Sequence, residues 1–427
     1  MKTQINIRWK LSLTMIMIAT CLVAWSNDLN QPDKVDEEVK VFTGKVIDSE
    51  TKKPVIFANV YISGTSIGTV SNSDGEFVLK VPVSNLENTV NIDYIGYAST
   101  EISLNNLQGN NIDVGLNPDP VSIQEVIVRV DDPLKLLKMA LNKIHINYAS
   151  EPAMLTGFYR ETIKKNRNYV AVSEAIMDIY KSSYKSDFST DRVRILKGRK
   201  SADVERMDTV LFKLQGGPTT SVLLDIVKNP SNLLSAEYID FYDYSFAGII
   251  NVDEKQNYVI GFDQKKDHDL PLYSGKIYLD MDNLAITRID FNLSEYGLKN
   301  ANQSLVRKKP VNMKVDVVGA NYLVKYRELD GKWYLNHVRS EMKFKCKWDK
   351  KLFKSNYSTM FEMAVTDMDT ENVEKIKFSE SAKFSDVFID HVQYYEDEDF
   401  WGDYNYIKPD ESIESAIYKL NKKIAKK

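Results

Sequence analysis

Apolar and polar residues alternate along most of the chain, which predicts β-strands rather than helices. Between residues 41 and 97 the alternation forms four short runs: VFTGKVID, FANVYISG, GEFVLKVP and TVNIDYIGY. Clusters of turn-forming residues such as SETKKP and SNSDG separate them. Strands at a spacing of ~8 to 12 residues are typical of a small sandwich. We therefore predict a seven-strand β-sandwich over residues 41–118, which ends where Pro118 and Pro120 interrupt strand pairing.

Longer strands joined by tight turns follow from residue 151 to residue 400. AGIINVDEKQNYVIGF, SGKIYLDMDNLAITRIDFNL and NYLVKYRELDGKWYLNHVRSEMKFKCKW each contain a turn cluster between two β-rich arms. Asp330-Gly331 is a strong signal for a two-residue hairpin. Successive hairpins predict an antiparallel meander curved into a half-barrel. The predicted fold class is therefore mostly β, with a sandwich, a long-stranded half-barrel and a few helices.

Three segments have the spacing of helices. Residues 119–150 form a linker and an amphipathic helix, in which Asp132 caps the start and Pro133 occupies the first turn. The stripe that defines this helix consists of Leu134, Leu137, Leu141, Ile144 and Tyr148. SVLLDIVKNPSNLL predicts a short helix that ends before Pro230. The tail, residues 401–427, predicts a C-terminal helix with Ile413, Ile417 and Leu420 on one side.

The N-terminal residues indicate export. Residues 1–26 combine a basic start with an uncharged apolar run that falls short of the ~20 residues needed to span a bilayer, as in a signal peptide. We predict cleavage after Ser26 and a flexible lead over residues 27–40. The less favoured alternative is a lipoprotein signal with acylation of Cys21. The predicted location is the periplasm or the periplasmic or outer face of the outer membrane.

Composition and charge limit the classes of partner. The chain has 56 basic and 60 acidic residues and a formal net charge of −4, which gives no overall attraction to nucleic acid. No segment beyond the signal has 18 uncharged apolar residues, so we predict no membrane-spanning helix in the mature chain. Cys346 is the only cysteine after the predicted cleavage, and its strand pattern predicts a buried thiol rather than a reactive one.

The stretch SNSDGEFVLKVP at 71–82 places three oxygen-bearing side chains around Gly75, as a calcium loop would. In such a loop the first and twelfth ligands would be Val70 and Val81, and neither side chain has an oxygen. Asp74-Gly75 is instead a favourable turn pair, because glycine adopts positive φ and aspartate bonds its own backbone. We predict a turn, followed by a strand whose core face carries Phe77, Leu79 and Val81.

Other chemical motifs give no predicted catalytic, cofactor or metal residue. Ser66 lies in Gly64-Thr65-Ser66-Ile67-Gly68, which matches the G-x-S-x-G hydrolase pattern, but strands flank it where a strand-to-helix turn is required. The histidines, His145, His268, His337 and His391, lack the spacing of a zinc site. Asp267-His268-Asp269 could hold a metal loosely, although a solvated loop is the favoured interpretation.

One local cluster of basic residues could contact lipid phosphates or an acidic partner. Its members are Arg192, Arg194, Lys197, Arg199 and Lys200. A solvated strand face is the favoured interpretation of the same pattern.

Residues 41–117 resemble a carboxypeptidase regulatory-like domain, a transthyretin-like sandwich. The matching elements are Gly44-Lys45-Val46, Ala58-Asn59-Val60, Asp74-Gly75 with Phe77, and Gly96-Tyr97. The same module precedes TonB-dependent receptors, but only ~300 residues follow it here, too few for a plug and barrel. Residues 150–400 resemble the curved sheet of outer-membrane lipoprotein-sorting carriers, and this resemblance implies a concave face that holds acyl chains.

These patterns predict a non-enzymatic envelope protein that binds an apolar or lipid-like ligand in the half-barrel. The alternative is an interaction scaffold that docks to another outer-membrane protein through the sandwich. A remote alternative is a hydrolase, which would require Ser66 or His268 to line a cleft beside a catalytic partner. An apolar cavity would favour ligand binding, and a filled interior would favour the scaffold.

Overall fold

The structure is a computed structural model that describes residues 38–106, 112–119, 131–185, 190–202, 216–252, 255–305, 312–349, 353–395 and 400–424. The predicted signal peptide, Cys21, almost all of the predicted lead and residues 120–130 of the predicted linker lie outside the described residues. Residues 40–427 form one compact unit.

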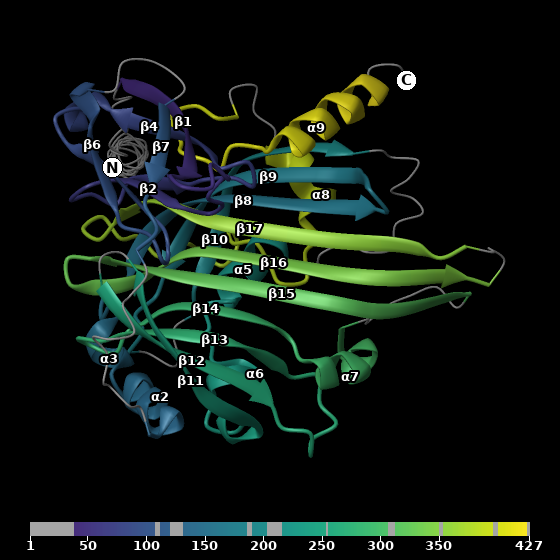
Figure 1. The fold of residues 1–427 in the computed structure, drawn as a ribbon. Coiled ribbons are helices and arrows are strands. Elements are labelled where there is room, and N and C mark those ends of the chain that lie inside the picture. The colour runs from purple at the N-terminus through teal and green to yellow at the C-terminus, as the bar shows by residue number, and fades with distance from the viewer. Residues whose placement is uncertain are drawn as a thin grey trace, which may run out of the picture. The chain divides into compact units, whose positions relative to one another are not determined.

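Seven short strands form the sandwich, as predicted. They are β1 (Val39–Asp48), β2 (Asn59–Ile62), β3 (Gly68–Val70), β4 (Glu76–Pro82), β5 (Thr89–Asp93), β6 (Thr100–Ser103) and β7 (Ile112–Leu116). One sheet has the order β4-β1-β7, in which β1 and β7 are parallel, and the other has the order β3-β2-β5-β6 (Figure 1). Phe77, Leu79 and Val81 of β4 are buried in the core between the sheets, as predicted.

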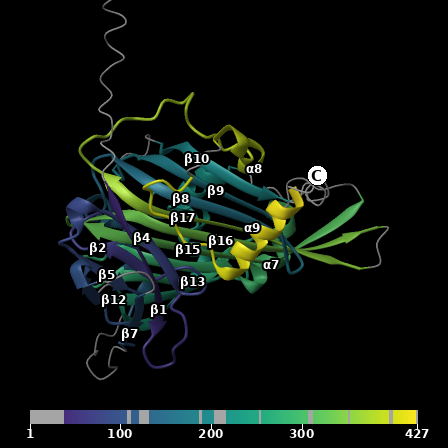
Figure 2. The same ribbon diagram turned by 90° about the horizontal axis from the view of Figure 1, so that it is seen from above.

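Ten longer strands form one open antiparallel sheet. They are β8 (Ala153–Lys165), β9 (Asn168–Lys181), β10 (Arg192–Ala202), β11 (Tyr242–Val252), β12 (Lys255–Gln264), β13 (Tyr273–Asp280), β14 (Ile286–Leu293), β15 (Met313–Leu329), β16 (Lys332–Trp348) and β17 (Ser355–Asp369). The order is β10-β9-β8-β17-β16-β15-β14-β13-β12-β11, so β17 joins two meanders. Figure 2 shows these strands beneath the sandwich.

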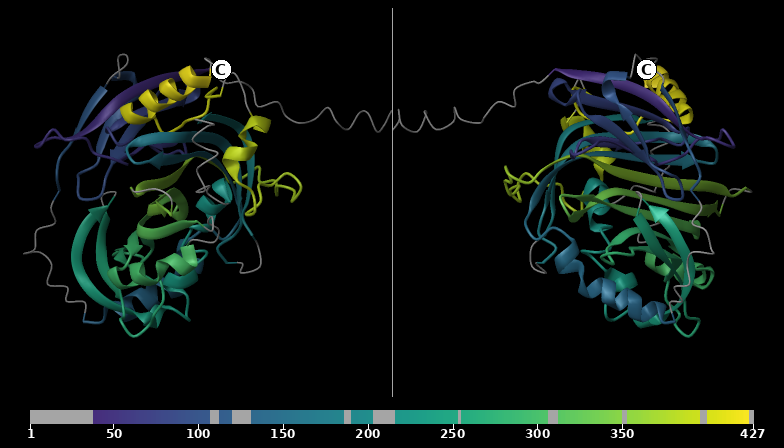
Figure 3. Two further views of the ribbon diagram at one scale, coloured as in Figure 1. Left: turned by 90° about the vertical axis from the view of Figure 1, so that its right-hand side faces the viewer. Right: turned by 60° about the vertical axis from the view of Figure 1, so that its left-hand side comes forward.

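The sheet is curved, and its hairpins are those that the sequence predicts. Val193 near one edge and Phe262 near the other belong to the same buried apolar cluster, which requires the sheet to curl around it (Figure 3). Asp330 and Gly331 connect β15 to β16 with φ values of 50° and 73°. A type I′ turn, the common turn of a two-residue hairpin, requires positive φ at both central residues. The mostly β fold is therefore confirmed, with the half-barrel realised as an open ten-stranded sheet.

Helices are short and lie between or after the strands. The α-helices are α2 (Pro133–Asn142), α3 (Ile144–Asn147), α5 (Gly217–Leu223), α6 (Ser231–Leu234), α7 (Glu295–Leu305), α8 (Phe388–His391) and α9 (Glu411–Ile424). The 3₁₀ turns are η1 (Val83–Asn85), η2 (Leu104–Asn106), η3 (Ile239–Phe241) and η4 (Val392–Tyr395).

The predicted cap of α2 is confirmed, but its stripe is longer than the helix. The Asp132 carboxylate accepts a hydrogen bond from the Lys135 backbone N–H at 2.8 Å. The helix ends at Asn142, and Tyr148 lies beyond α3 in extended backbone. The Tyr148 hydroxyl donates to the Ile286 carbonyl at 2.6 Å. A tertiary hydrogen bond therefore places the last residue of the predicted stripe.

The helix predicted to end just before Pro230 is shorter than expected. It ends at Leu223, and Pro230 instead precedes α6. Asp225 is fully buried, 2.6 Å from the Lys181 ammonium, and it accepts hydrogen bonds from the hydroxyls of Tyr184 and Tyr326. These contacts prevent the residues after Leu223 from continuing the helix that the spacing of apolar residues predicts.

Candidate functional site

The two faces of the large sheet carry different chemistry, and each face includes a candidate site. We call the face that carries Arg160 of β8 the outer face and the face that carries Tyr159 the inner face. The sandwich and the C-terminal segment, residues 400–411, contact the outer face. Helices α2, α5 and α6 pack into the inner face.

Five charged residues in register cross the outer face, one from each of five adjacent strands. In order they are Arg199, Glu174, Arg160, Glu362 and Arg339, and we call them the ionic ladder. Four contacts connect them: Arg199 Nε to Glu174 Oε2 at 2.6 Å, Arg160 Nε to Glu174 Oε1 at 2.7 Å, Arg160 Nη1 to Glu362 Oε1 at 3.0 Å, and Arg339 Nη1 to Glu362 Oε2 at 2.6 Å. Opposite charges directly across neighbouring strands stabilise a sheet.

The centre of the ladder is removed from water. Arg160, Glu174 and Glu362 are at most 3% exposed. Each carboxylate lies between two guanidinium groups, so the buried charges are paired, as burial requires. Three cations face two anions, and the ladder has one unmatched positive charge.

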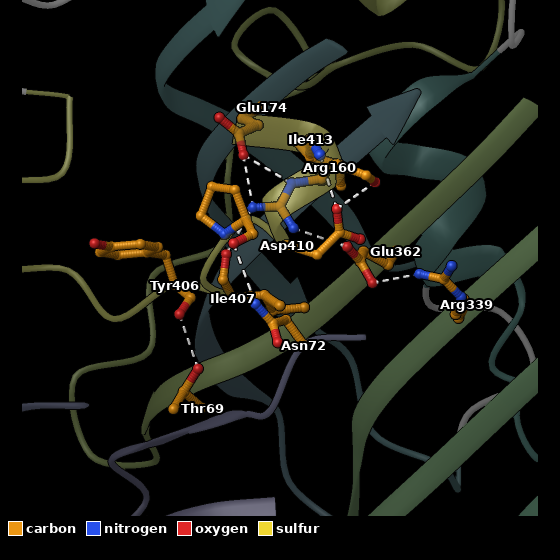
Figure 4. Close-up of polar contacts among 12 residues, drawn as sticks. Thr69, Asn72, Arg160, Glu174, Arg339, Glu362, Tyr406, Ile407, Asp410 and Ile413 are labelled. Atoms are coloured by element: carbon orange, nitrogen blue, oxygen red, sulfur yellow. Dashed lines mark hydrogen bonds and ion pairs between the residues drawn. The ribbon is translucent and has the colours of Figure 1, made fainter. Parts of the chain in front are cut away.

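The C-terminal segment covers the ladder (Figure 4). Arg160 Nη2 donates to the Ile407 carbonyl at 2.6 Å. The Arg199 guanidinium lies 4.1 Å from the centroid of the Trp401 ring, and this ring stacks on Tyr406 at 3.7 Å. The buried Arg160 therefore holds this segment through one carbonyl, and the partly exposed Arg199 holds it through an aromatic pair.

The turn that resembled a calcium loop also holds this segment. The Asn72 carboxamide donates to the Pro409 carbonyl at 3.1 Å, and Glu76 pairs with Lys408 at 2.7 Å. The Asp74 carboxylate accepts from the Glu411 backbone N–H at 2.8 Å. Asn72 rather than Asp74 organises the turn, since its oxygen accepts from the backbone N–H groups of Asp74 and Glu76. The predicted role of Asp74 was wrong, because a segment more than 330 residues away occupies its carboxylate.

A cavity of about 270 Å³ lies where the sandwich turn, the outer face and the start of α9 meet. We call it the junction cavity. Its lining includes Asn72 from the turn, Lys164, Arg339 and Glu362 from the sheet, and Asp410 before α9. Polar groups from three distant parts of the sequence therefore surround one space.

The inner face has two apolar clusters on either side of a row of polar residues. The first cluster includes Tyr159, Phe361 and Val338 and packs against α2, α5 and α6. The second cluster lies on the long strands towards their other ends and contains Ile163, Val315, Val317, Ala320, Phe344, Cys346 and Tyr357. Its members from outside the sheet, among the described residues, come from α7, α8 and Val387.

Four polar residues separate these clusters, and we call them the polar belt: Ser173, Glu161, Thr359 and Ser340. Ser173 and Glu161 are directly opposite each other on β9 and β8. Phe361 is paired with Glu161 on one side and Ser340 on the other, and Thr359 lies two residues from Phe361. The hydroxyl oxygens of Ser173, Ser340 and Thr359 are buried and have no hydrogen-bond partner in the part of the chain that the structure describes.

Glu161 is the ionisable member of the belt. It is 2% exposed, and burial raises the pKa of its carboxyl to about 8. The Tyr159 hydroxyl donates to it at 2.9 Å, and the backbone N–H of Ile389 is a second donor. Hydrogen bonds from these two neutral donors lower the pKa of Glu161, but by less than burial raises it. The carboxyl is therefore largely protonated at neutral pH.

The residues that the sequence analysis considered and rejected as catalytic or reactive have structural roles. The Ser66 hydroxyl donates to the Asp367 carboxylate at 2.6 Å and to the Met368 carbonyl at 3.0 Å. Ser66 lies between β2 and β3, and these bonds attach the sandwich to β17. Cys346 is fully buried in the second cluster, as predicted, and burial raises the pKa of its thiol to about 11.

The histidines occupy four separate environments. His145 and His391 are exposed in α3 and α8. His268 stacks on the Phe241 ring at 4.1 Å and lies 3.4 Å from Asp267. Asp269 accepts a hydrogen bond from Tyr296 at 2.6 Å. Among the described residues, no group of three or more His, Cys, Asp or Glu side chains is arranged to hold a metal ion.

The fourth histidine, His337, is buried beneath the sandwich. Its ring centroid lies 5.6 Å from that of Phe57, and both ring nitrogens lack a hydrogen-bond partner in the described ranges. Burial lowers its pKa well below the usual value, and Lys325, Arg339 and Arg288 lower it further. His337 is therefore neutral in the folded protein.

The basic residues at 192–200 are partly exposed, and each has a contact with another described residue. Arg192 donates to the Ile376 carbonyl at 2.5 Å, Arg194 pairs with Asp178 at 2.6 Å, and Lys200 donates to the Ile389 carbonyl at 3.3 Å. Arg199 belongs to the ladder, and Lys197 lies 5.9 Å from the Tyr404 ring centroid. The favoured prediction of a solvated strand face agrees with this partial exposure. Nothing in the sequence indicated that residues 376–404 return to this strand and supply most of the partners.

Comparison with known proteins identifies the sandwich. Residues 42–128 are a CarboxypepD_reg-like domain. The chain is 31% identical over 94 residues to TonB-dependent receptor P3 of Formosa agariphila, an alignment that covers 22% of this chain and 9% of the receptor. A domain of this kind is therefore shared with a TonB-dependent receptor, and most of the receptor has no counterpart in the alignment.

Two solved structures resemble the chain at low identity. A DUF1329 family protein from Desulfovibrio piger is 12% identical, with 57% of this chain and 95% of that chain covered and a TM-score of 0.24. A membrane-associated protein of unknown function from Bacteroides fragilis is 10% identical, with 78% and 99% covered and a TM-score of 0.16. The resemblance of residues 150–400 to lipoprotein-sorting carriers stays a prediction.

Proposed function

We propose that the chain is a non-enzymatic cell-envelope protein that binds an apolar, lipid-like ligand against the inner face of the large sheet. The domain shared with a TonB-dependent receptor and the predicted export signal support the envelope location. No helix among the described residues is long and apolar enough to cross a membrane. The ligand would lie on the second apolar cluster with its polar end at the polar belt.

The polar belt is the observation that carries this proposal. A buried hydroxyl without a partner costs ~1 to 3 kcal/mol, so three of them beside a protonated carboxyl are unfavourable in a passive core. Tyr273, Tyr322 and Met342 contact both clusters and are nevertheless partly exposed. A ligand with a polar end and an apolar chain would satisfy the hydroxyls and cover these side chains.

Native mass spectrometry of protein purified from lipid-replete membranes tests the proposal. We expect a bound mass that organic extraction removes and added lipid restores. Val317→Trp would add bulk within the second cluster, where the ligand would lie, and reduce lipid uptake. Val318→Trp is the matched control, because Val317 is 6% exposed on the inner face and its neighbour is 49% exposed. A clean apo mass with no lipid uptake, or equal loss in both variants, would contradict the proposal.

The packing of the first cluster favours a second candidate, an interaction scaffold. Helices α2, α5 and α6 fill that half of the inner face, and the sandwich is attached to the outer face. The scaffold would dock to another outer-membrane protein through the side of the sandwich that carries the exposed Val41 and Val83. Cross-linking in intact envelopes from a residue substituted at Val83 would detect this partner, and a variant altered at the exposed Val318 is its control.

A further inference from the structure

The junction cavity on the outer face has cationic donors that no other described group uses. It lies on the opposite face of the sheet from the polar belt, so the inference below does not depend on lipid binding. The contacts of Arg339 and Lys164 carry it, since both side chains line the cavity and both are held in place.

Arg339 is the end of the ionic ladder and is held on two sides. Its Nη1 donates to Glu362 at 2.6 Å, and its guanidinium carbon lies 4.8 Å from the Phe57 ring centroid. A guanidinium has five N–H donors in one plane. Neither Nε nor Nη2 of Arg339 has an acceptor among the described residues. A fixed planar cation with unused donors therefore borders the cavity.

Lys164 is a second cation with unused donors. Its ammonium lies 4.1 Å from the Tyr169 ring centroid, and the Tyr169 hydroxyl is 3.2 Å from Ser412 Oγ at the start of α9. The ring contact orients the ammonium but accepts none of its hydrogen bonds in the usual sense. In the described parts of the chain, no oxygen accepts from Lys164 Nζ.

The carboxylates around the cavity already have partners. Glu362 accepts from both Arg160 and Arg339. Asp410 accepts from the Ile413 backbone N–H and the Ser412 hydroxyl, and so caps α9. Glu341 lines the cavity and lies 3.5 Å from Lys343, which does not line it. The lining carries three cations, Arg160, Lys164 and Arg339, and three carboxylates, Glu341, Glu362 and Asp410. Arg339 and Lys164 are the cations of this lining with donors that no described group uses.

We propose that the junction cavity binds the oxyanion, phosphate or carboxylate, of a small polar molecule through Arg339 and Lys164. Two cations that donate several hydrogen bonds are suited to an oxyanion with two or more acceptor oxygens. The volume of about 270 Å³ is near the lower end of the ~300 to 1,000 Å³ typical of ligand pockets. The bound part of the molecule is therefore about the size of one phosphate-bearing group or one acidic sugar ring.

Calorimetric titration of the full chain at low ionic strength tests this site with three probes: inorganic phosphate, glycerol 1-phosphate and glucuronate. We expect saturable binding of at least one probe, weakened about tenfold or more by Lys164→Gln and by Arg339→Gln, because each substitution removes a charged hydrogen bond. Lys345→Gln is the matched control, since Lys345 is exposed on β16, the strand that carries Arg339, and does not line the cavity. This control variant should bind as the unaltered chain does.

The probe that binds most tightly identifies the source of the oxyanion. A preference for inorganic phosphate indicates a free anion, a preference for glycerol 1-phosphate indicates a lipid headgroup, and a preference for glucuronate indicates an acidic sugar. Failure of all three probes to bind saturably overturns the proposal, as does unchanged affinity in Lys164→Gln. Lys164→Gln keeps the test valid if Arg339→Gln unfolds, because Lys164 contributes only a ring contact to the fold.

Discussion

The two faces of the large sheet surround their buried carboxyl groups with different hydrogen-bond donors. Glu174 and Glu362 on the outer face and Glu161 on the inner face are buried to the same degree, at 3% exposure or less. Each outer carboxylate lies between two guanidinium groups, whereas the donors to Glu161 among the described residues are neutral and its pKa is raised to about 8. Burial alone therefore does not determine the charge of a group, and the partners across neighbouring strands do.

Breaking the ladder at its centre should have the largest effect on stability. Arg160→Met leaves Glu174 and Glu362 with one guanidinium each and leaves the Ile407 carbonyl without its donor. Removal of one partner from a buried ion pair costs about 3 to 5 kcal/mol. Urea unfolding at neutral pH measures the change in the free energy of unfolding.

Arg194→Met is the matched control for this substitution. Arg194 also pairs with a cross-strand carboxylate, Asp178, but its side chain is 39% exposed. Exposed pairs contribute at most about 1 kcal/mol. Equal losses in the two variants would show that the burial of the ladder has no energetic consequence.

The inner face should make the protein less stable as pH rises. The folded pKa of Glu161 is about 8 and its ordinary value is 4.5, so between these values the folded state keeps a proton that the unfolded state has lost. This contribution to stability is fully present below pH 4.5 and is lost as pH rises through 8. Glu161→Gln should flatten the decline in the free energy of unfolding between pH 5 and pH 8. An unchanged slope would contradict a neutral Glu161.

The outer face provides the contrast with the opposite sign. The pKa of His337 is lowered in the folded state, so the unfolded state binds the extra proton below pH 6.5. Its contribution is fully present above pH 6.5 and is lost as pH falls. The charged groups that face it are Lys325, Arg339 and Arg288, all cations. His337→Leu should therefore reduce the loss of stability in acid. It should leave unchanged the decline in the free energy of unfolding that Glu161 causes as pH rises.

The smallest expected effect concerns the unpaired hydroxyls of the belt. Thr359→Val removes a buried hydroxyl that has no partner among the described residues and should raise the free energy of unfolding of the lipid-free protein by about 1 kcal/mol. Thr366→Val on the same strand is the control, because the Thr366 hydroxyl donates to the Thr156 carbonyl at 3.2 Å. The control should lower stability. Destabilisation by both substitutions would show that Thr359 is hydrogen-bonded.

Part of the inner face could have been found in the sequence, but the outer face could not. In the strand MLTGFYRETI, Glu161 falls on the apolar side of the alternation, between Tyr159 and Ile163, and this position marks an unusual carboxyl. The ladder gives no comparable signal. Arg160 contacts Glu362, 202 residues away, and the Ile407 carbonyl, 247 residues away, and charged residues at such separations could have many other partners.

The sequence by itself determined the local features: the strands of the sandwich, the hairpin at Asp330-Gly331, the cap at Asp132 and the C-terminal helix. These depend on strand alternation, turn conformation and hydrogen bonds within a few residues, and the chain encodes them wherever it folds. Only the tertiary structure decided that Asn72 and Asp74 hold the C-terminal segment, and that the described hydrogen-bond donors of Glu161 are neutral. Such roles depend on strand order and register, which bring together groups that are far apart in the chain.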